Sequence, residues 1–114
     1  MNMKIRLAGS VMSSVQGRVE VYYSGVWGTV CSDGWDLSDG HVVCRMLGFT
    51  RAVQISRLSY FGPGTGPALL SKVGCRGNEH SLSNCSHSGW AEVRYCGHNS
   101  GVVCSTGTFL HSLS

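Results

Sequence analysis

The stretch GRVEVYYSGVWGTVCSDGW, residues 17–35, decides the fold. Apolar and polar residues alternate in its first half, with Val19 and Val21 on one face of the expected strand. This alternation predicts a half-buried strand whose solvated face presents Arg18, Glu20 and Tyr22. A Ser-Gly turn follows, and VWGTVC predicts the second strand of a hairpin that ends at Cys31.

Cys31 is one of six cysteines in a chain of 114 residues that has sixteen glycines and only 13% charged residues. No two cysteines stand in the C-x-x-C spacing that zinc sites typically use. A catalytic nucleophile would not need five further cysteines. An even number of dispersed cysteines in a short chain is typical of a disulfide-bonded domain from an oxidising compartment. We therefore expect a single small domain held together by three disulfides.

Few other regular elements are predicted. KIRLA predicts a first strand and GVVC a short closing strand, whereas residues 50–70 predict an irregular strand and turns. One helix is expected in DLSDGHVVCRMLG, residues 36–48, with Ser38 or Asp36 as the N-cap and Gly48 at its end. No apolar run approaches the length of a membrane span, and the first ten residues lack the apolar stretch of a signal peptide.

Several motifs, taken in order, closely resemble the scavenger receptor cysteine-rich (SRCR) domain. They are GRVEV, WGTVC, the helix D-L-x-D-x-x-V-V-C-R-x-L-G, C-x-G-x-E-x-x-L-x-x-C and the terminal G-V-x-C. We predict an SRCR domain over residues 4–105 and a disordered tail over residues 106–114. Phe49 stands where some members have a further cysteine, so the chain resembles the six-cysteine group A.

The resemblance implies an α+β fold in which a curved antiparallel sheet cradles one α-helix. It also implies a disulfide pairing, which cysteine spacing alone leaves open. The pairs implied are Cys31–Cys96, Cys44–Cys104 and Cys75–Cys85.

The solvated strand face is the first candidate ligand site. In a relative that agglutinates bacteria, the motif V-E-V-L followed four residues later by Trp binds microbial surfaces. Val19, Glu20, Val21 and Trp27 match it here, with Tyr22 in place of the leucine. The alternative is that the two valines and Trp27 are simply core residues of the hairpin. The ligand-binding candidates are Arg18, Glu20, Tyr22 and Trp27.

A calcium site is the second candidate, because many SRCR domains supply acidic residues after the first of these cysteines and before the last. In this chain Ser32 replaces the first acid and leaves Asp33, and CGHNSGVVC has lost its acids and leaves Asn99 and Ser100. One carboxylate with two neutral oxygens is a poor ligand set for calcium. We therefore expect no cofactor, and the alternative is a degenerate calcium site at Asp33 and Asn99.

Arginine supplies most of the positive charge, with seven arginines against two lysines and a net charge of +3. Guanidinium groups bind sulfate, phosphate and carboxylate groups bidentately. The arginines are scattered along the chain, so they are either solubilising charges or are gathered by the fold into a polyanion-binding surface. Besides Arg6 and Arg18, the candidates are Arg45, Arg51, Arg57, Arg76 and Arg94.

No catalytic motif is present, since the chain lacks G-x-S-x-G and H-E-x-x-H, and GPGTGP lacks the lysine of a phosphate loop. The sequence favours a non-catalytic extracellular module, either secreted or part of a cell-surface ectodomain. We expect innate recognition of microbial or other polyanionic surfaces or glycans, with nucleic acid bound only as a generic polyanion. The alternative is a structural module that docks a specific protein receptor or positions a neighbouring domain.

Overall fold

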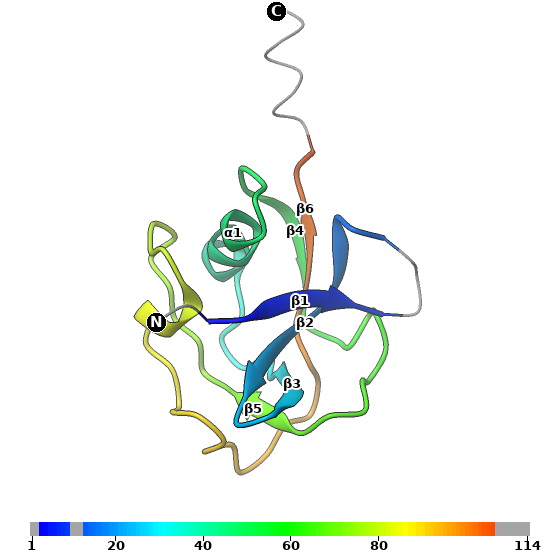
Figure 1. Cartoon of the computed structure of the whole chain (residues 1–114), viewed down its shortest axis with the longest axis vertical. Coiled ribbons are helices and arrows are strands. Elements are labelled where there is room, and N and C mark those ends of the chain that lie inside the picture. Colours follow the sequence, from blue (N-terminus) through cyan, green and yellow to red (C-terminus); the bar gives the residue numbers. More distant parts are fainter. Residues whose placement is uncertain (1–2, 10–12, 107–114) are drawn as a thin grey trace, which may run out of the picture.

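The computed structural model describes residues 3–9 and 13–106, so the predicted disordered tail lies almost wholly outside the described residues. Within these ranges the chain forms a strongly curved sheet with one α-helix packed against it (Figure 1). The expected hairpin, helix and closing strand are confirmed. In chain order the elements are β1 (Ile5–Ala8), β2 (Gln16–Tyr23), β3 (Val26–Val30), α1 (Leu37–Met46), β4 (Ala52–Ser56), β5 (Ala68–Leu70), the 3-10 helix η1 (Leu82–Asn84) and β6 (Gly101–Cys104).

Strand β2 is the centre of the sheet. One of its edges pairs with β1, and the other pairs first with β6 and then with β3, all antiparallel. Strand β4 extends the sheet beyond β6, and β5 extends it beyond β3. The expected fold class is confirmed, but the sheet is mixed, because β5 runs parallel to β3. A long connection through α1 and β4 separates these two strands, so no tight turn forces them to be antiparallel.

The helix covers the concave face of the sheet. The inward residues Val19 and Val21 are fully buried, as predicted, and they share one core with Val42 and Val43 of the helix. Gly40 of the helix allows α1 to lie close to β4, because a Cβ atom at this position would be only 2.7 Å from a methyl carbon of Ile55 on β4. Glycine lowers helix propensity, so here packing against the sheet outweighs propensity.

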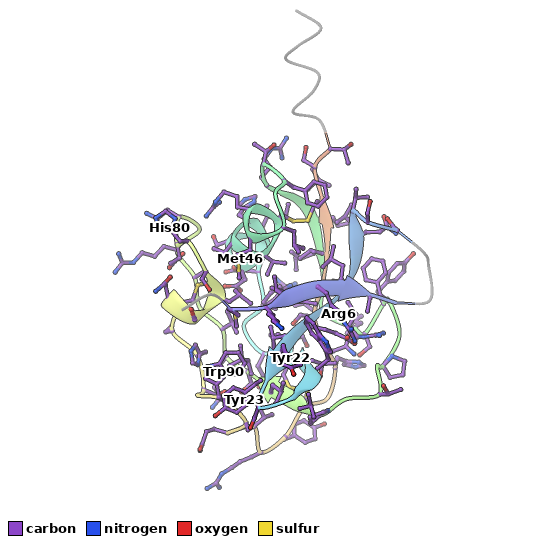
Figure 2. The ribbon with its side chains drawn as sticks, viewed as in Figure 1. Arg6, Tyr22, Tyr23, Met46, His80 and Trp90 are labelled. Carbon is purple, nitrogen blue, oxygen red and sulfur yellow. A yellow bond between two sulfur atoms is a disulfide. The ribbon has the colours of Figure 1, made fainter. Side chains whose placement is uncertain are left out.

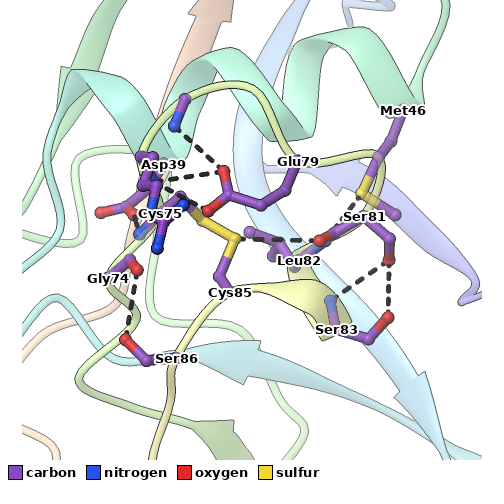
Figure 3. The surroundings of a disulfide bond; sticks show 12 residues. Asp39, Met46, Gly74, Cys75, Glu79, Ser81, Leu82, Ser83, Cys85 and Ser86 are labelled. Atoms are coloured by element: carbon purple, nitrogen blue, oxygen red, sulfur yellow. Dashed lines mark hydrogen bonds between the residues drawn. A yellow bond between two sulfur atoms is a disulfide. The ribbon is translucent and has the colours of Figure 1, made fainter.

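Asp36, rather than Ser38, caps the helix. Its carboxylate accepts the N–H of Asp39, and the Asp39 carboxylate accepts the N–H of Asp36, which makes a reciprocal capping box. Asp39 also accepts the N–H of Cys75 at 2.8 Å and is fully buried (Figure 3). This carboxylate therefore joins the start of the helix to a loop 36 residues away in the sequence.

We predict that Asp39 makes stability depend on pH. Desolvation by burial raises the pKa of its carboxyl from 3.8 to about 6, although two backbone N–H groups act in the opposite direction. A carboxyl whose pKa is raised in the folded state stabilises the fold below pH 4, and that contribution is lost as the pH rises through 6. The side chain of Asp39→Asn does not titrate, so this variant is the reference. Relative to it, wild-type protein should lose up to about 3 kcal/mol of unfolding free energy between pH 4 and pH 7.

Urea unfolding of both proteins across this pH range measures the difference. If wild-type protein instead gained stability over Asp39→Asn as the pH rose, the N–H donors would outweigh desolvation and the prediction would be wrong.

All three expected disulfides are confirmed: Cys31–Cys96, Cys44–Cys104 and Cys75–Cys85. The second joins α1 directly to β6, across the core. The third closes a short loop around η1, where Leu82 donates its N–H to the sulfur of Met46 on the helix (Figure 3).

Candidate ligand-binding site

The convex face of the β1–β2–β3 strands gathers cations and aromatic rings. Strand pairing places Arg6 opposite Glu20 and Tyr22 opposite Trp27, so side chains from three strands meet on one surface. Figure 2 shows Arg6 and Tyr22 over this part of the sheet. We call this surface the basic face, and its members are Lys4, Arg6, Arg18, Tyr22 and Trp27.

Glu20 lies beneath these cations and is only 4% exposed. One carboxylate oxygen lies 2.7 Å from Nη2 of Arg6, and the other accepts Nε of Arg18 at 2.8 Å. Arg18 also donates to the carbonyl oxygens of Phe61 and Gly62, so both its position and its hydrogen bonds are fixed. Glu20 occupies the predicted solvated face but is covered by its two partners. Arg6, whose side chain is 48% exposed, remains accessible.

Two aromatic rings hold the exposed cations in place. Tyr22 and Trp27 pack edge to face with their centroids 5.3 Å apart. The Lys4 ammonium lies 4.8 Å from the centre of the Tyr22 ring, and the Arg6 guanidinium lies 4.2 Å from that of Trp27. Such cation–π contacts limit the freedom of long cationic side chains. Trp27 itself is half-buried on the outer surface. It does not belong to the core, unlike the two valines of the motif.

The fold brings only some of the candidate arginines together. Arg45 and Arg76 both contact Glu79: Arg45 donates to its carbonyl oxygen, and the Arg76 backbone N–H donates to its carboxylate. That N–H, together with the N–H of Gly77, lowers the pKa of the Glu79 carboxyl. The remaining candidates lie apart from the basic face. Arg51 precedes β4, Arg57 follows β4 and Arg94 lies in the loop before Cys96.

Sequence reasoning missed Lys4 as a candidate. The alternation of Lys4 and Arg6 with Ile5 and Leu7 in KIRLA is the signal that places both cations on one strand face. What the alternation does not reveal is that β1 pairs with β2 and so adds these cations to Arg18.

Comparison with known proteins then decides the family, because residues 9–105 match the family description "Scavenger receptor cysteine-rich domain". The chain belongs to the SRCR family. Its six cysteines and three disulfides fit group A. SRCR domains are extracellular binding modules rather than enzymes.

Similar proteins support the assignment to the SRCR family. The SRCR domain is 55% identical over 95 residues to the galectin-3-binding protein of Rattus norvegicus, a match that spans 82% of this chain and 16% of that protein. It is 46% identical over 104 residues to lysyl oxidase homolog 2 of Mus musculus, spanning 90% of this chain and 13% of that protein. The chain thus corresponds to a small part of these relatives.

Two crystal structures of SRCR domains share the fold. The domain of mouse MARCO, crystallised in a dimeric form, is 43% identical with a TM-score of 0.71, over 83% of this chain and 92% of that one. The third SRCR domain of murine neurotrypsin is 36% identical with a TM-score of 0.78, over 90% and 96% of the two chains. Neither of the two helices that the structure describes, over residues 3–9 and 13–106, has the length and hydropathy to cross a membrane.

The residues at the expected calcium position of this SRCR domain do not fit that ion. Asp33 is exposed, whereas Asn99 is 5% exposed and donates its side-chain N–H groups to the carbonyl oxygens of Gly62 and Pro63. Asn99 therefore anchors a loop. Calcium takes roughly six to eight oxygen ligands, and one exposed carboxylate beside a committed amide falls far short of that number.

One other group of side chains within the described residues has metal-ligand spacing: Cys75, Glu79 and Cys85. Both sulfurs are bonded to each other, so they supply no thiolate to a metal (Figure 3). Two of the histidines also have structural partners. His41 accepts the N–H of Ala52, and His87 accepts the N–H of Gly89.

Proposed function

We propose that this SRCR domain binds polyanionic surfaces, microbial or other, through the basic face. The observation that supports the proposal best is the pair of arginines held on the buried Glu20 carboxylate. Two guanidinium groups and the Lys4 ammonium share one negative charge, so the face has an excess of positive charge. Because Glu20 and the aromatic rings already order these side chains, an anion that binds them does not have to immobilise flexible cations.

The proposed recognition needs no bound cation, because the donors to the anion are protein side chains. Sulfate, phosphate and carboxylate groups can all accept hydrogen bonds from the half-exposed guanidinium of Arg6, whose Nε and Nη2 also contact Glu20. Single contacts of this kind are weak in water, so useful affinity would come from several contacts along a repeating ligand or from several copies of the domain.

We expect the domain to bind immobilised heparin and lipoteichoic acid through the side chains of the basic face. Arg6→Ala and Lys4→Ala should each weaken binding about fivefold, which corresponds to about 1 kcal/mol. Wild-type affinity should also fall steeply as salt rises from 50 mM to 300 mM, because exposed ionic contacts are screened, with a Debye length of about 10 Å at 0.1 M. Surface plasmon resonance, run in calcium and again in EDTA, measures both effects and should give the same values in the two buffers.

Arg51→Ala is the matched control, because it removes the same charge outside the basic face. An equal loss of affinity in Arg51→Ala would show that only net charge matters. Binding that tolerates salt and is unaffected by Arg6→Ala would instead favour a shape-specific protein interface.

A further inference from the structure

A groove of about 630 Å³ lies on the convex side of the sheet, beyond the basic face. We call it the outer groove, and its lining includes Gln16, Gln54, Ser56, Arg57, Tyr60 and Phe61. Gln16 of β2 and Gln54 of β4 both lie opposite Val103 of β6, so two amides flank one apolar side chain. No lining residue is acidic.

Hydrogen-bonding groups converge on the groove. The Ser56 hydroxyl is buried and has no partner among the described residues, which is uncommon for a buried polar atom. Arg57 donates Nε to the carbonyl oxygen of Trp35, and this bond fixes the guanidinium beside the groove. Its terminal nitrogens have no partner within residues 3–9 and 13–106, so they can bind an anion.

The groove also presents a flat apolar surface. Tyr60 is 75% exposed and is held edge to face against the buried Phe61, with the ring centroids 5.0 Å apart. An exposed ring fixed in this way provides contact area at little cost in side-chain entropy. Apolar faces combined with a few convergent polar groups are typical of small-ligand sites.

The chemistry of the lining selects among occupants. An acyl chain would cover the two glutamine amides without hydrogen-bonding to them, which is costly. Two copies of this chain that met groove to groove would bring their Arg57 guanidinium groups together with no carboxylate between them, because the groove has none. A sugar ring with a carboxylate or sulfate group can contact each of these groups. Its hydroxyls hydrogen-bond to the two glutamine amides, its apolar face packs on Tyr60, and its charged group binds Arg57.

The outer groove is continuous with the basic face. Gln16, Arg18, Glu20 and Tyr22 alternate along the same face of β2, and six residues of strand span roughly 20 Å. Phe61 connects the two surfaces directly, because it lines the groove and its carbonyl oxygen accepts a hydrogen bond from the Arg18 guanidinium at 3.0 Å. A linear ligand can therefore occupy both surfaces at once.

We propose that the outer groove binds one acidic sugar unit of a polysaccharide whose neighbouring anionic groups bind the basic face. This inference rests on the proposed function and narrows its ligand class from any polyanion to acidic carbohydrate. The basic face provides charge, and the groove distinguishes a sugar from other anions.

The test compares two polyanions of matched charge, a size-defined heparin hexasaccharide and a linear polyphosphate, by isothermal titration calorimetry at 50 mM salt. Tyr60→Ala and Gln54→Ala should each lower affinity for the hexasaccharide about fivefold and leave affinity for polyphosphate unchanged. Tyr95→Ala is the matched control, because Tyr95 is 79% exposed and does not line the groove. Lys4→Ala should lower affinity for both polyanions, and the melting temperature of each variant checks its fold.

Two outcomes would overturn the inference without contradicting the proposed function. In the first, Lys4→Ala lowers the affinity for both polyanions but Tyr60→Ala lowers neither. In the second, Tyr60→Ala lowers the affinity for both polyanions equally. A third outcome would also overturn the inference and assign the groove to a lipid. In that outcome Tyr60→Ala weakens binding of dodecyl phosphate but leaves binding of the hexasaccharide unchanged. If neither polyanion binds wild-type protein, the proposed function itself is wrong.

Discussion

Replacing Cys44 and Cys104 together by alanine should destabilise the domain by about 4 kcal/mol. The disulfide spans 60 residues, so in the chain-entropy model it removes a large part of the conformational freedom of the unfolded chain. Small domains are stable by only roughly 5–15 kcal/mol in total. Loss of this bond should therefore leave a large unfolded fraction at 37 °C, which circular dichroism during urea unfolding would measure.

The loop disulfide provides an internal comparison. Cys75 and Cys85 are only 10 residues apart, and the same model gives about 3 kcal/mol for their bond. The double variant Cys75→Ala/Cys85→Ala should accordingly unfold at a higher urea concentration than Cys44→Ala/Cys104→Ala. The reverse order would show that local packing around the loop, rather than loop entropy, determines how much each bond stabilises the fold.

Local patterns predicted the elements that depend on neighbours in the sequence. The alternation around Val19 and Val21 gives β2, and the short turn after it gives the hairpin, because both signals lie within a few residues. Helix α1 is also local, since its N-cap Asp36 and the glycine that follows its last turn, Gly48 with a φ of 95°, both lie next to the segment itself. The parallel pairing of β5 with β3 was not predictable in this way, because it joins segments about forty residues apart.

The candidate site shows the same division. Period-two alternation correctly placed Arg18 and Tyr22 on the outward face of β2. The burial of Glu20 was not visible in the sequence, because it depends on β1 lying beside β2 and adding Arg6. Asn99 shows the limit for metal sites: a side chain at the expected position is committed elsewhere, to the loop carbonyl oxygens.

Glu20→Gln should destabilise the fold and also weaken polyanion binding. The substitution keeps the size of the side chain but removes the charge that pairs with Arg18, whose side chain is only 12% exposed. Breaking a buried ion pair leaves an uncompensated charge, and we expect a loss of about 3 kcal/mol, near the lower end of the usual range, because Arg18 retains its bonds to two carbonyl oxygens. Urea unfolding measures this loss.

Binding gives the sharper result, because two explanations predict opposite changes. Glu20→Gln raises the net positive charge of the basic face, so a surface that attracted polyanions by charge alone would bind heparin more tightly. If Glu20 acts by holding Arg6 and Arg18 in position, the freed arginines lose that order and affinity should fall about threefold despite the added charge. Surface plasmon resonance at 50 mM salt separates the two, and tighter binding by Glu20→Gln with unchanged stability would refute the positioning role of Glu20.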